Sequence, residues 1–251
     1  MANEYQALAP VYDRIGMSRF AEDLTARLLT YAQQNEWMGR HILDLGCGTG
    51  ALMSWFAKNQ SRIGVTGVDY QPEMLALARA NVQAHGVEPN LIEQDIRQLE
   101  GPSGFDMVVA LDVLNELDGL RDLGTVFSKV RGALAPGKLF VFDLHTFEGL
   151  INRGIDGDHE ILNDDDFAVF VRNRYDYERQ AESSHYTIFS RTDAAWQRSA
   201  AQRLLRGFPI QAVITLLRRN EFELLAVTDE QFAAIDPNTP GTGRILIIAR
   251  K

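Results

Sequence analysis

Glycines and carboxylates are concentrated in the stretch of the chain where ligand chemistry is easiest to place. The apolar run Ile42–Leu45 passes directly into a loop with glycine at every second position: Gly46, Gly48 and Gly50. Such a loop lets a ligand press against bare backbone, and the first turn of the predicted helix after it has unpaired N–H donors. Strand, loop and helix therefore predict the first half of a βαβ nucleotide-binding unit.

The second half of this unit also fits, because Val65–Asp69 has the pattern of a strand that ends in an acid. Asp69 lies 19 residues after Gly50, where nucleotide-binding folds place a carboxylate for ribose hydroxyls. Residues 42 to 57 contain no Lys or Arg, although the pyrophosphate of a dinucleotide is an anion. Acids instead follow the predicted carboxyl ends of four successive strands: Asp44, Asp69, Asp95 and Asp112. Carboxylates that converge on one crevice suit a cofactor with cationic groups, such as S-adenosylmethionine, and disfavour an NAD-dependent oxidoreductase.

Three segments resemble successive motifs of class I S-adenosylmethionine-dependent methyltransferases: Asp44–Gly50, Asp69–Met74 and Gln94–Ile96. The resemblance implies an α/β fold, a doubly wound, seven-stranded, mostly parallel Rossmann-like sheet with helices on both faces. It also implies that Asp95 accepts a hydrogen bond from the adenine amino group and that Ile96 packs on the ring. The cofactor-binding residues expected from the family are Tyr12, Asp44, Gly46, Cys47, Gly48, Gly50, Asp69, Tyr70, Met74, Asp95, Ile96 and Leu111.

The composition limits the class of protein. The 251 residues are enough for one domain, or one domain with an insert, and 45% are hydrophobic. A net charge of −9 argues against a duplex nucleic-acid partner. The single cysteine, Cys47, rules out an internal disulfide framework and is better explained as a small residue in a tight loop than as a nucleophile. We expect no signal peptide, no membrane span and a cytoplasmic location.

The segment before the nucleotide unit, residues 1–39, is expected to be a helical leader with an amphipathic helix over about 18–35. Its stretch Tyr5–Asp13 resembles the opening of small-molecule methyltransferases related to the sugar-amine N-methyltransferases. There the leader folds over the cofactor and a tyrosine reaches the active site. Tyr12 is therefore a candidate catalytic and cofactor-binding residue, and Tyr5 a candidate substrate-binding residue; the alternative is that both are packed aromatics.

Polar residues also follow the fourth and fifth predicted strands. Phe105–Leu111 has the continuous apolar pattern of a buried parallel strand, and Asn115 and Glu116 after it are candidates for the acceptor pocket. Capping or surface roles on the next helix are the alternative. His145 follows the fifth strand at the same edge and, with Tyr12 and Glu116, completes the catalytic candidates. Residues 151–166 are expected to form a mobile surface loop, and no metal site is predicted.

Three β-rich runs then follow one another without helices: Phe167–Tyr177, Ser184–Arg191 and Trp196–Phe208. They predict a small antiparallel β insert, residues 146–207, in a core formed by residues 1–145 and 208–251. The insert resembles the sheet that sugar-amine-type methyltransferases place over their active sites or use as a dimer interface. Arg172 and Arg174 are candidates for binding an anionic substrate group, and the alternative is cross-strand pairing with local acids.

The predicted function is methyl transfer from S-adenosyl-L-methionine to a nitrogen or oxygen of a small-molecule acceptor by in-line displacement, with S-adenosyl-L-homocysteine as product. A neutral amine acceptor already has a lone pair and needs no general base. The alternative is a non-catalytic S-adenosylmethionine-binding or scaffold protein. The sequence does not separate the two, because both would keep the glycine loop and Asp69.

Overall fold

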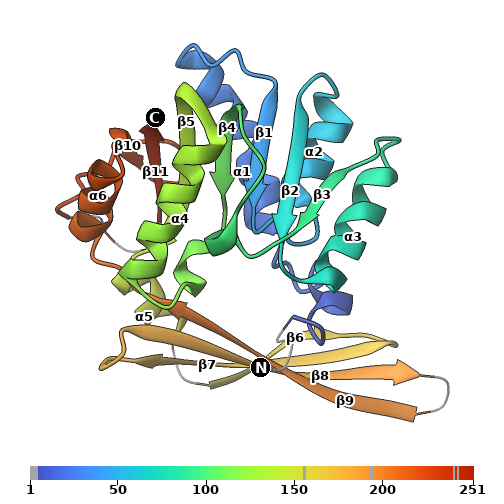
Figure 1. The fold of residues 1–251 in the computed structure, drawn as a ribbon. Coiled ribbons are helices and arrows are strands. Elements are labelled where there is room, and N and C mark those ends of the chain that lie inside the picture. The colour runs from blue at the N-terminus through green and yellow to red at the C-terminus, as the bar shows by residue number, and fades with distance from the viewer. Residues whose placement is uncertain (1–4, 155–156, 193–194, 240, 242) are drawn as a thin grey trace.

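The computed structural model describes residues 5–154, 157–192, 195–239, 241 and 243–251, and they form two sheets (Figure 1). The larger sheet has seven strands in the order β10-β11-β5-β4-β1-β2-β3. The first five strands in the chain pair in parallel, whereas β11 is antiparallel to both β5 and β10. This topology confirms the predicted doubly wound, mostly parallel sheet. The strands are β1 (His41–Leu45), β2 (Gly64–Asp69), β3 (Asn90–Glu93), β4 (Phe105–Ala110), β5 (Leu134–His145), β10 (Glu223–Thr228) and β11 (Arg244–Arg250).

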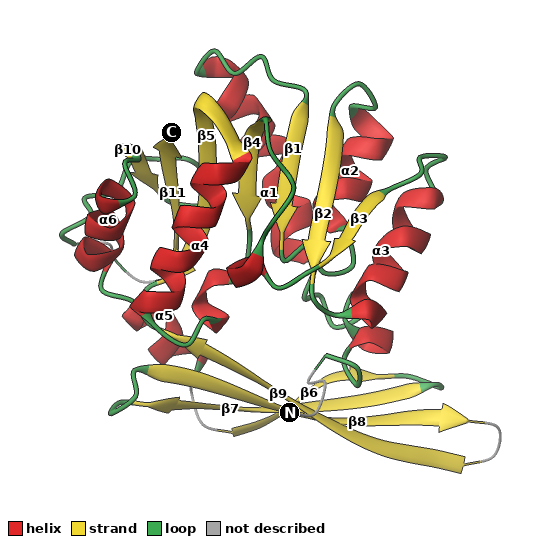
Figure 2. Ribbon diagram, in the orientation of Figure 1, coloured by secondary structure: helices red, strands yellow, loops and turns green. Residues whose placement is uncertain are grey.

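Helices cover both faces of this sheet (Figure 2). Neighbouring strand residues point to opposite faces, so Ile42 packs in the core cluster with α1 and α2, while Leu43 packs in the cluster with α4 and α6. The α-helices are α1 (Arg19–Gln34), α2 (Ala51–Asn59), α3 (Pro72–Gln83), α4 (Leu120–Ala133), α5 (Phe147–Arg153) and α6 (Ile210–Arg219). Short 3-10 turns cover Ala9–Val11, Ile96–Gln98 and Leu114–Glu116. In the part of the chain that is described, no helix is both long and apolar enough to cross a bilayer.

The smaller sheet is antiparallel and lies beyond the carboxyl edge of the parallel strands (Figure 1). Its strands follow one another in the order β6 (Gly157–Asn163), β7 (Phe167–Asp176), β8 (Ala181–Thr192) and β9 (Ala195–Arg206). The leader packs between this sheet and α3, where Leu8, Val11 and Met74 share one apolar cluster with Val169 and Tyr186. The assignment of residues 146–207 as a separate insert stays a prediction.

The predicted mobile loop over 151–166 is wrong for the described residues. Helix α5 runs to Arg153, and β6 pairs along β7. The Asp, Asn and Gly content of this segment favours turns, but the edge of β7 offers backbone partners that override the local preference. Among the described residues, a turn follows α5 at Gly154, and another lies near Asp164, whose carboxylate accepts the N–H groups of Asp166 and Phe167.

Candidate active site

The glycine loop adopts a conformation that side chains would prevent. Gly46, Gly48 and Gly50 have φ angles of 68°, 52° and 76°, in the left-handed region that favours glycine. A Cβ on Gly46 would lie 2.6 Å from a methyl carbon of Val113, so the loop has no room there. A Cβ on Gly48 would have its nearest neighbours at 3.8 Å and 3.9 Å, the latter being the Tyr12 hydroxyl. The Gly48 side of the loop is therefore the side open to a ligand.

The Asp69 carboxylate fixes the loop from the next strand. It accepts the N–H of Gly48 at 2.9 Å and the N–H of Gln71 at 3.0 Å. Burial raises the pKa of Asp69, and these backbone hydrogen bonds work in the opposite direction. Burial, and then the charge of Asp69, raise the pKa of Asp44 to about 7. Two carboxyl groups thus converge behind the glycine loop, as the sequence predicted for this edge of the sheet.

A cavity of about 390 Å³ opens where this loop, the leader and strand β9 meet. This volume is within the range of small-molecule and cofactor sites. The cavity brings together Asp112 and eleven of the predicted site residues: Tyr5, Tyr12, Gly46, Gly48, Asp69, Tyr70, Met74, Asp95, Ile96, Leu111 and Glu116. Other predicted site residues are not in its lining: Asp44, Cys47, Gly50, Asn115, His145, Arg172 and Arg174.

At one end of this cavity, Asp95 is already paired. It caps the turn of Ile96 by accepting the backbone N–H of Arg97 at 2.8 Å, and its carboxylate binds the Arg97 guanidinium at 2.6 Å. Burial alone would raise the pKa of Asp95, but the hydrogen bonds and charge of Arg97 hold it below the usual range. Arg97 also lines the cavity, although none of the sequence motifs predicted a role for it.

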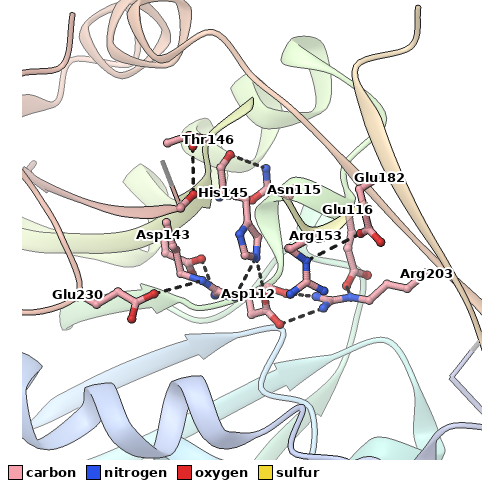
Figure 3. Close-up of polar contacts among 12 residues, drawn as sticks. Asp112, Asn115, Glu116, Asp143, His145, Thr146, Arg153, Glu182, Arg203 and Glu230 are labelled. Atoms are coloured by element: carbon pink, nitrogen blue, oxygen red, sulfur yellow. Dashed lines mark hydrogen bonds and ion pairs between the residues drawn. The ribbon is translucent and has the colours of Figure 1, made fainter. Parts of the chain in front are cut away.

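The other end of the cavity meets a largely buried ion-pair cluster of Asp112, Glu116, Asp143, Arg203 and Arg244. Figure 3 labels the first four of these residues. Asp112 has a φ of 57°, and its backbone N–H donates to Asp143 at 2.6 Å. Its carboxylate lies 3.0 Å from a terminal nitrogen of Arg203 and 2.9 Å from one of Arg244. Arg244 also binds Asp143 at 2.8 Å. The cluster therefore joins the ends of β4 and β5 to β9 and β11.

Glu116 belongs to the cluster and is not a free base. Its Oε1 accepts a hydrogen bond from the Arg203 Nε at 2.7 Å and one from the Tyr5 hydroxyl. Burial raises the pKa of Tyr5 well above its usual range, and it raises that of Tyr12 as well. Both phenols therefore remain protonated, and Tyr5 is positioned as a hydrogen-bond donor.

Asn115 and His145 are brought together, but behind the cavity wall. Asn115 accepts the backbone N–H of His145 at 2.8 Å and donates to the backbone oxygen of Arg206 at 2.7 Å. The His145 ring lies 2.9 Å from a nitrogen of Arg244, and burial lowers its pKa to about 4. Their predicted contact with substrate is thus replaced by structural contacts: Asn115 lies between β5 and β9, and the His145 ring lies between Arg244 and Asp112.

Arg172 and Arg174 lie on the opposite side of the smaller sheet from the cavity. Alternate residues of β7 face opposite sides, and both arginines are exposed, whereas Val169 and Val171 are buried. Arg172 pairs with Asp158 on the neighbouring strand. The prediction that Arg172 and Arg174 bind an anionic substrate group is therefore wrong, because both lie on the face of the sheet that is turned away from the cavity. Arg203 has the same alternation as the buried Leu205 of β9, and this pattern could have identified it from the sequence.

The comparisons with known proteins agree with this geometry. A family model described as a methyltransferase domain matches residues 42–137. This segment is a methyltransferase domain. The match confirms the predicted resemblance of this segment to methyltransferases.

Two relatives show how far the similarity to this methyltransferase domain extends. A protein of Geobacillus sp. (strain WCH70) is 34% identical over 148 residues, which are 57% of this chain and 58% of that protein. YqeM of Bacillus subtilis (strain 168) is 28% identical over 93% of this chain and 92% of its own length. The names of both mark them provisionally as methyltransferases. The chain thus spans little more than half the length of the first relative.

Solved structures show the same fold over nearly the whole chain. An S-adenosylmethionine-dependent methyltransferase from Clostridium acetobutylicum ATCC 824 has a TM-score of 0.81, 22% identity and 99% coverage of both chains. CalS10, an amino pentose methyltransferase from Micromonospora echinaspora solved with S-adenosylmethionine bound, has a TM-score of 0.71, 23% identity and 96% coverage of both chains. The fold of the methyltransferase domain and that of the smaller sheet therefore occur together in other proteins.

Proposed function

We propose that this chain binds S-adenosylmethionine in the cavity of about 390 Å³ and transfers its methyl group to a nitrogen or oxygen of a small-molecule acceptor. The observation that carries the proposal is the open face of Gly48 beside the Asp69 carboxylate, in one cavity with Asp95 and Ile96. The methyltransferase domain match and the cofactor bound in CalS10 support it.

The residues of the cavity fit the cofactor by their chemistry. Asp69 uses one lone-pair direction on each oxygen for the loop, and a carboxylate has further acceptor sites for two ribose hydroxyls. Asp95 would accept the adenine amino group, and Ile96 would pack against the ring. The acids around the loop suit the positive charges of a sulfonium and an ammonium.

At the reacting end, the bound cofactor would supply a methyl group activated by a sulfonium. The chain would align the acceptor with this methyl group, and alignment alone can lower a barrier by several kcal/mol. Tyr5, Glu116 and Arg203 form one hydrogen-bonded unit there, so their positions are fixed before a ligand arrives. A neutral amine would use its own lone pair, and an alcohol would require a base that the paired Glu116 does not provide. This arrangement favours a nitrogen acceptor.

We also propose that residues 146–207 select the acceptor and leave cofactor binding to the rest of the chain. Their strand β9 supplies Arg203, Leu204 and Arg206 to the cavity wall. We further propose that the protein forms a dimer through this sheet and that it is located in the cytoplasm. Light scattering of the purified protein would test the dimer.

Calorimetry with S-adenosylmethionine, S-adenosylhomocysteine and NAD tests the cofactor. We expect micromolar affinity for the first two and no heat with NAD; the opposite pattern would refute the proposal. Mass spectrometry of the protein with S-adenosylmethionine and a small-molecule extract tests the reaction. Binding without release of S-adenosylhomocysteine would favour the non-catalytic alternative.

A further inference from the structure

A second cavity of about 330 Å³ lies between the smaller sheet and the core. Its lining includes Arg153 of α5, residues 15–17 and 20 of the leader side, and Asn173, Ser184 and Tyr186 of the sheet. Asp112 and Arg203 line this cavity and also line the proposed cofactor cavity. The two cavities therefore share one wall, which is the Asp112–Arg203 ion pair.

A polar row crosses the inward face of the smaller sheet at this cavity. Asn173 on β7 lies opposite Ser184 on β8, and Ser184 lies opposite Arg203 on β9. The neighbouring inward residues Val169, Ile188 and others are apolar and buried. A polar row in an apolar sheet face needs hydrogen-bond partners.

Some polar atoms at this cavity have no hydrogen-bond partner among the described residues. Over the described residues, four buried side-chain polar atoms lack a hydrogen-bond partner. Three of them are near this cavity: the Nε of Arg153, the Oδ1 of Asn173 and the Oε2 of Glu182. Arg153 and Glu182 approach only to 4.0 Å, beyond hydrogen-bond distance. Unpartnered buried groups are uncommon in folded proteins. Their concentration in one place favours a polar ligand that accepts a hydrogen bond from Arg153 and donates one to Asn173.

The arginines around the cavity indicate the charge of the ligand that would fit. Arg203 and Arg244 each have carboxylates within 3.0 Å. Among the described residues, the ion-pair partner of Arg153 is the completely buried Glu182, at 4.0 Å, and the Arg153 side chain is 38% exposed. Burial raises the pKa of Glu182, which weakens it further as a counter-ion. Arg153 is thus the arginine of this cavity with charge available for a ligand.

We propose that the second cavity holds an anionic end of the methyl acceptor, a carboxylate or a phosphate, bound by Arg153, beside a hydroxyl or amino group of the same acceptor that donates to the Oδ1 of Asn173. The inference rests on the proposed methyl transfer and names the class of its substrate. An acceptor anchored here would lie against Arg203 and Asp112, with its other end directed to the cofactor cavity. A guanidinium is suited to both anions because it can donate two parallel hydrogen bonds.

The test uses the full chain, S-adenosylmethionine with a deuterated methyl group, and a metabolite extract separated by anion exchange. We expect labelled product in fractions retained by the column. Phosphatase treatment of the active fraction removes a phosphate acceptor, whereas carbodiimide amidation removes a carboxylate acceptor. Labelled product confined to the unretained fractions would overturn the inference.

Variants of Arg153 then test the anchor with the acceptor so obtained. Arg153→Met should raise the KM for the acceptor at least tenfold and leave the Kd of S-adenosylhomocysteine within twofold, while Arg153→Lys should recover part of the loss. Arg172→Met, on the outer face of the same sheet, is the matched control. An unchanged KM in Arg153→Met overturns the anchor. Absence of both cofactor binding and labelled product in the parent protein would instead refute the proposed function, and the anchor with it.

Discussion

A terminal nitrogen of Arg203 lies 3.0 Å from the Asp112 carboxylate, and so joins strand β9 to a left-handed residue just after β4. Arg203 also donates to the backbone oxygen of Asp112 at 2.6 Å. Both side chains are largely buried, at 4% and 14% exposure. The smaller sheet is thus connected to the core through a charge pair at the wall between two cavities.

The first prediction is that Arg203→Met destabilises the protein by about 3–5 kcal/mol, because Asp112 and Glu116 would lose a partner in a buried site. Urea unfolding followed by circular dichroism measures the change. Arg172→Met is the control: its pair with Asp158 is exposed and screened by solvent, so its loss should lower the stability far less than the loss of Arg203. Equal losses in the two variants would show that the cluster does not hold the sheets together.

The second prediction concerns Asp69→Ala. If the carboxylate holds two ribose hydroxyls, the variant loses two charge-assisted hydrogen bonds of about 1.5–3 kcal/mol each. The affinity for S-adenosylhomocysteine should fall by about a hundredfold or more. Calorimetry measures the affinity, and circular dichroism checks that the variant is folded. A folded variant that binds like the parent would place the ribose elsewhere.

The third prediction is a pH dependence of stability from Asp44, whose pKa is raised to about 7 in the folded protein. Between about pH 4 and pH 7, folded Asp44 keeps a proton that the unfolded chain releases. The free energy of unfolding therefore decreases as the pH rises through this window. Asp44→Asn removes this effect, so its stability relative to the parent should increase by about 2–4 kcal/mol from pH 4 to pH 8. Urea midpoints at the two pH values measure it; a constant difference contradicts the prediction.

The fourth prediction is that neither tyrosine of the leader acts as a base. Burial raises the pKa of Tyr5 and of Tyr12, so the phenols do not ionise near neutral pH. Tyr5→Phe removes one hydrogen bond to Glu116 and should lower kcat/KM by about threefold to tenfold. The shape of the pH–rate profile between pH 6 and pH 9 should not change. Loss of an alkaline limb in the variant would identify Tyr5 as the titrating group.

The core was predictable from the sequence because its signals are local. Glycine spacing at residues 46–50 and the apolar strand before it specify a turn that only one backbone path satisfies. The same logic placed Asp69 and Asp95 at the carboxyl edge. Glu221 shows a limit: it has a φ of 56° at the turn before Phe222, in the left-handed region that favours glycine, and a glutamate gives no local signal of that conformation.

The acceptor side was less predictable because its contacts are long-range. His145 follows a strand at the functional edge, yet Arg244, 99 residues later, occupies its ring nitrogen. Arg172 and Arg203 are equally basic in the sequence, and only their positions in the alternation of β7 and β9 separate an exposed residue from a buried one. The alternation of residues along a strand thus indicates which arginine faces the core, whereas the number of arginines does not.

The position of β11 has a consequence for how the chain folds. Residues 139–145 of β5 pair with β11, which begins at Arg244. Until β11 docks, β5 has one side without backbone partners, although Phe140 and Phe142 give it the composition of an interior strand. An unpaired apolar edge can recruit the same edge of another molecule, and pairing across such a sequence separation is slow. Refolding should therefore pass through a species in which β5 is open, and its yield should fall as the protein concentration rises.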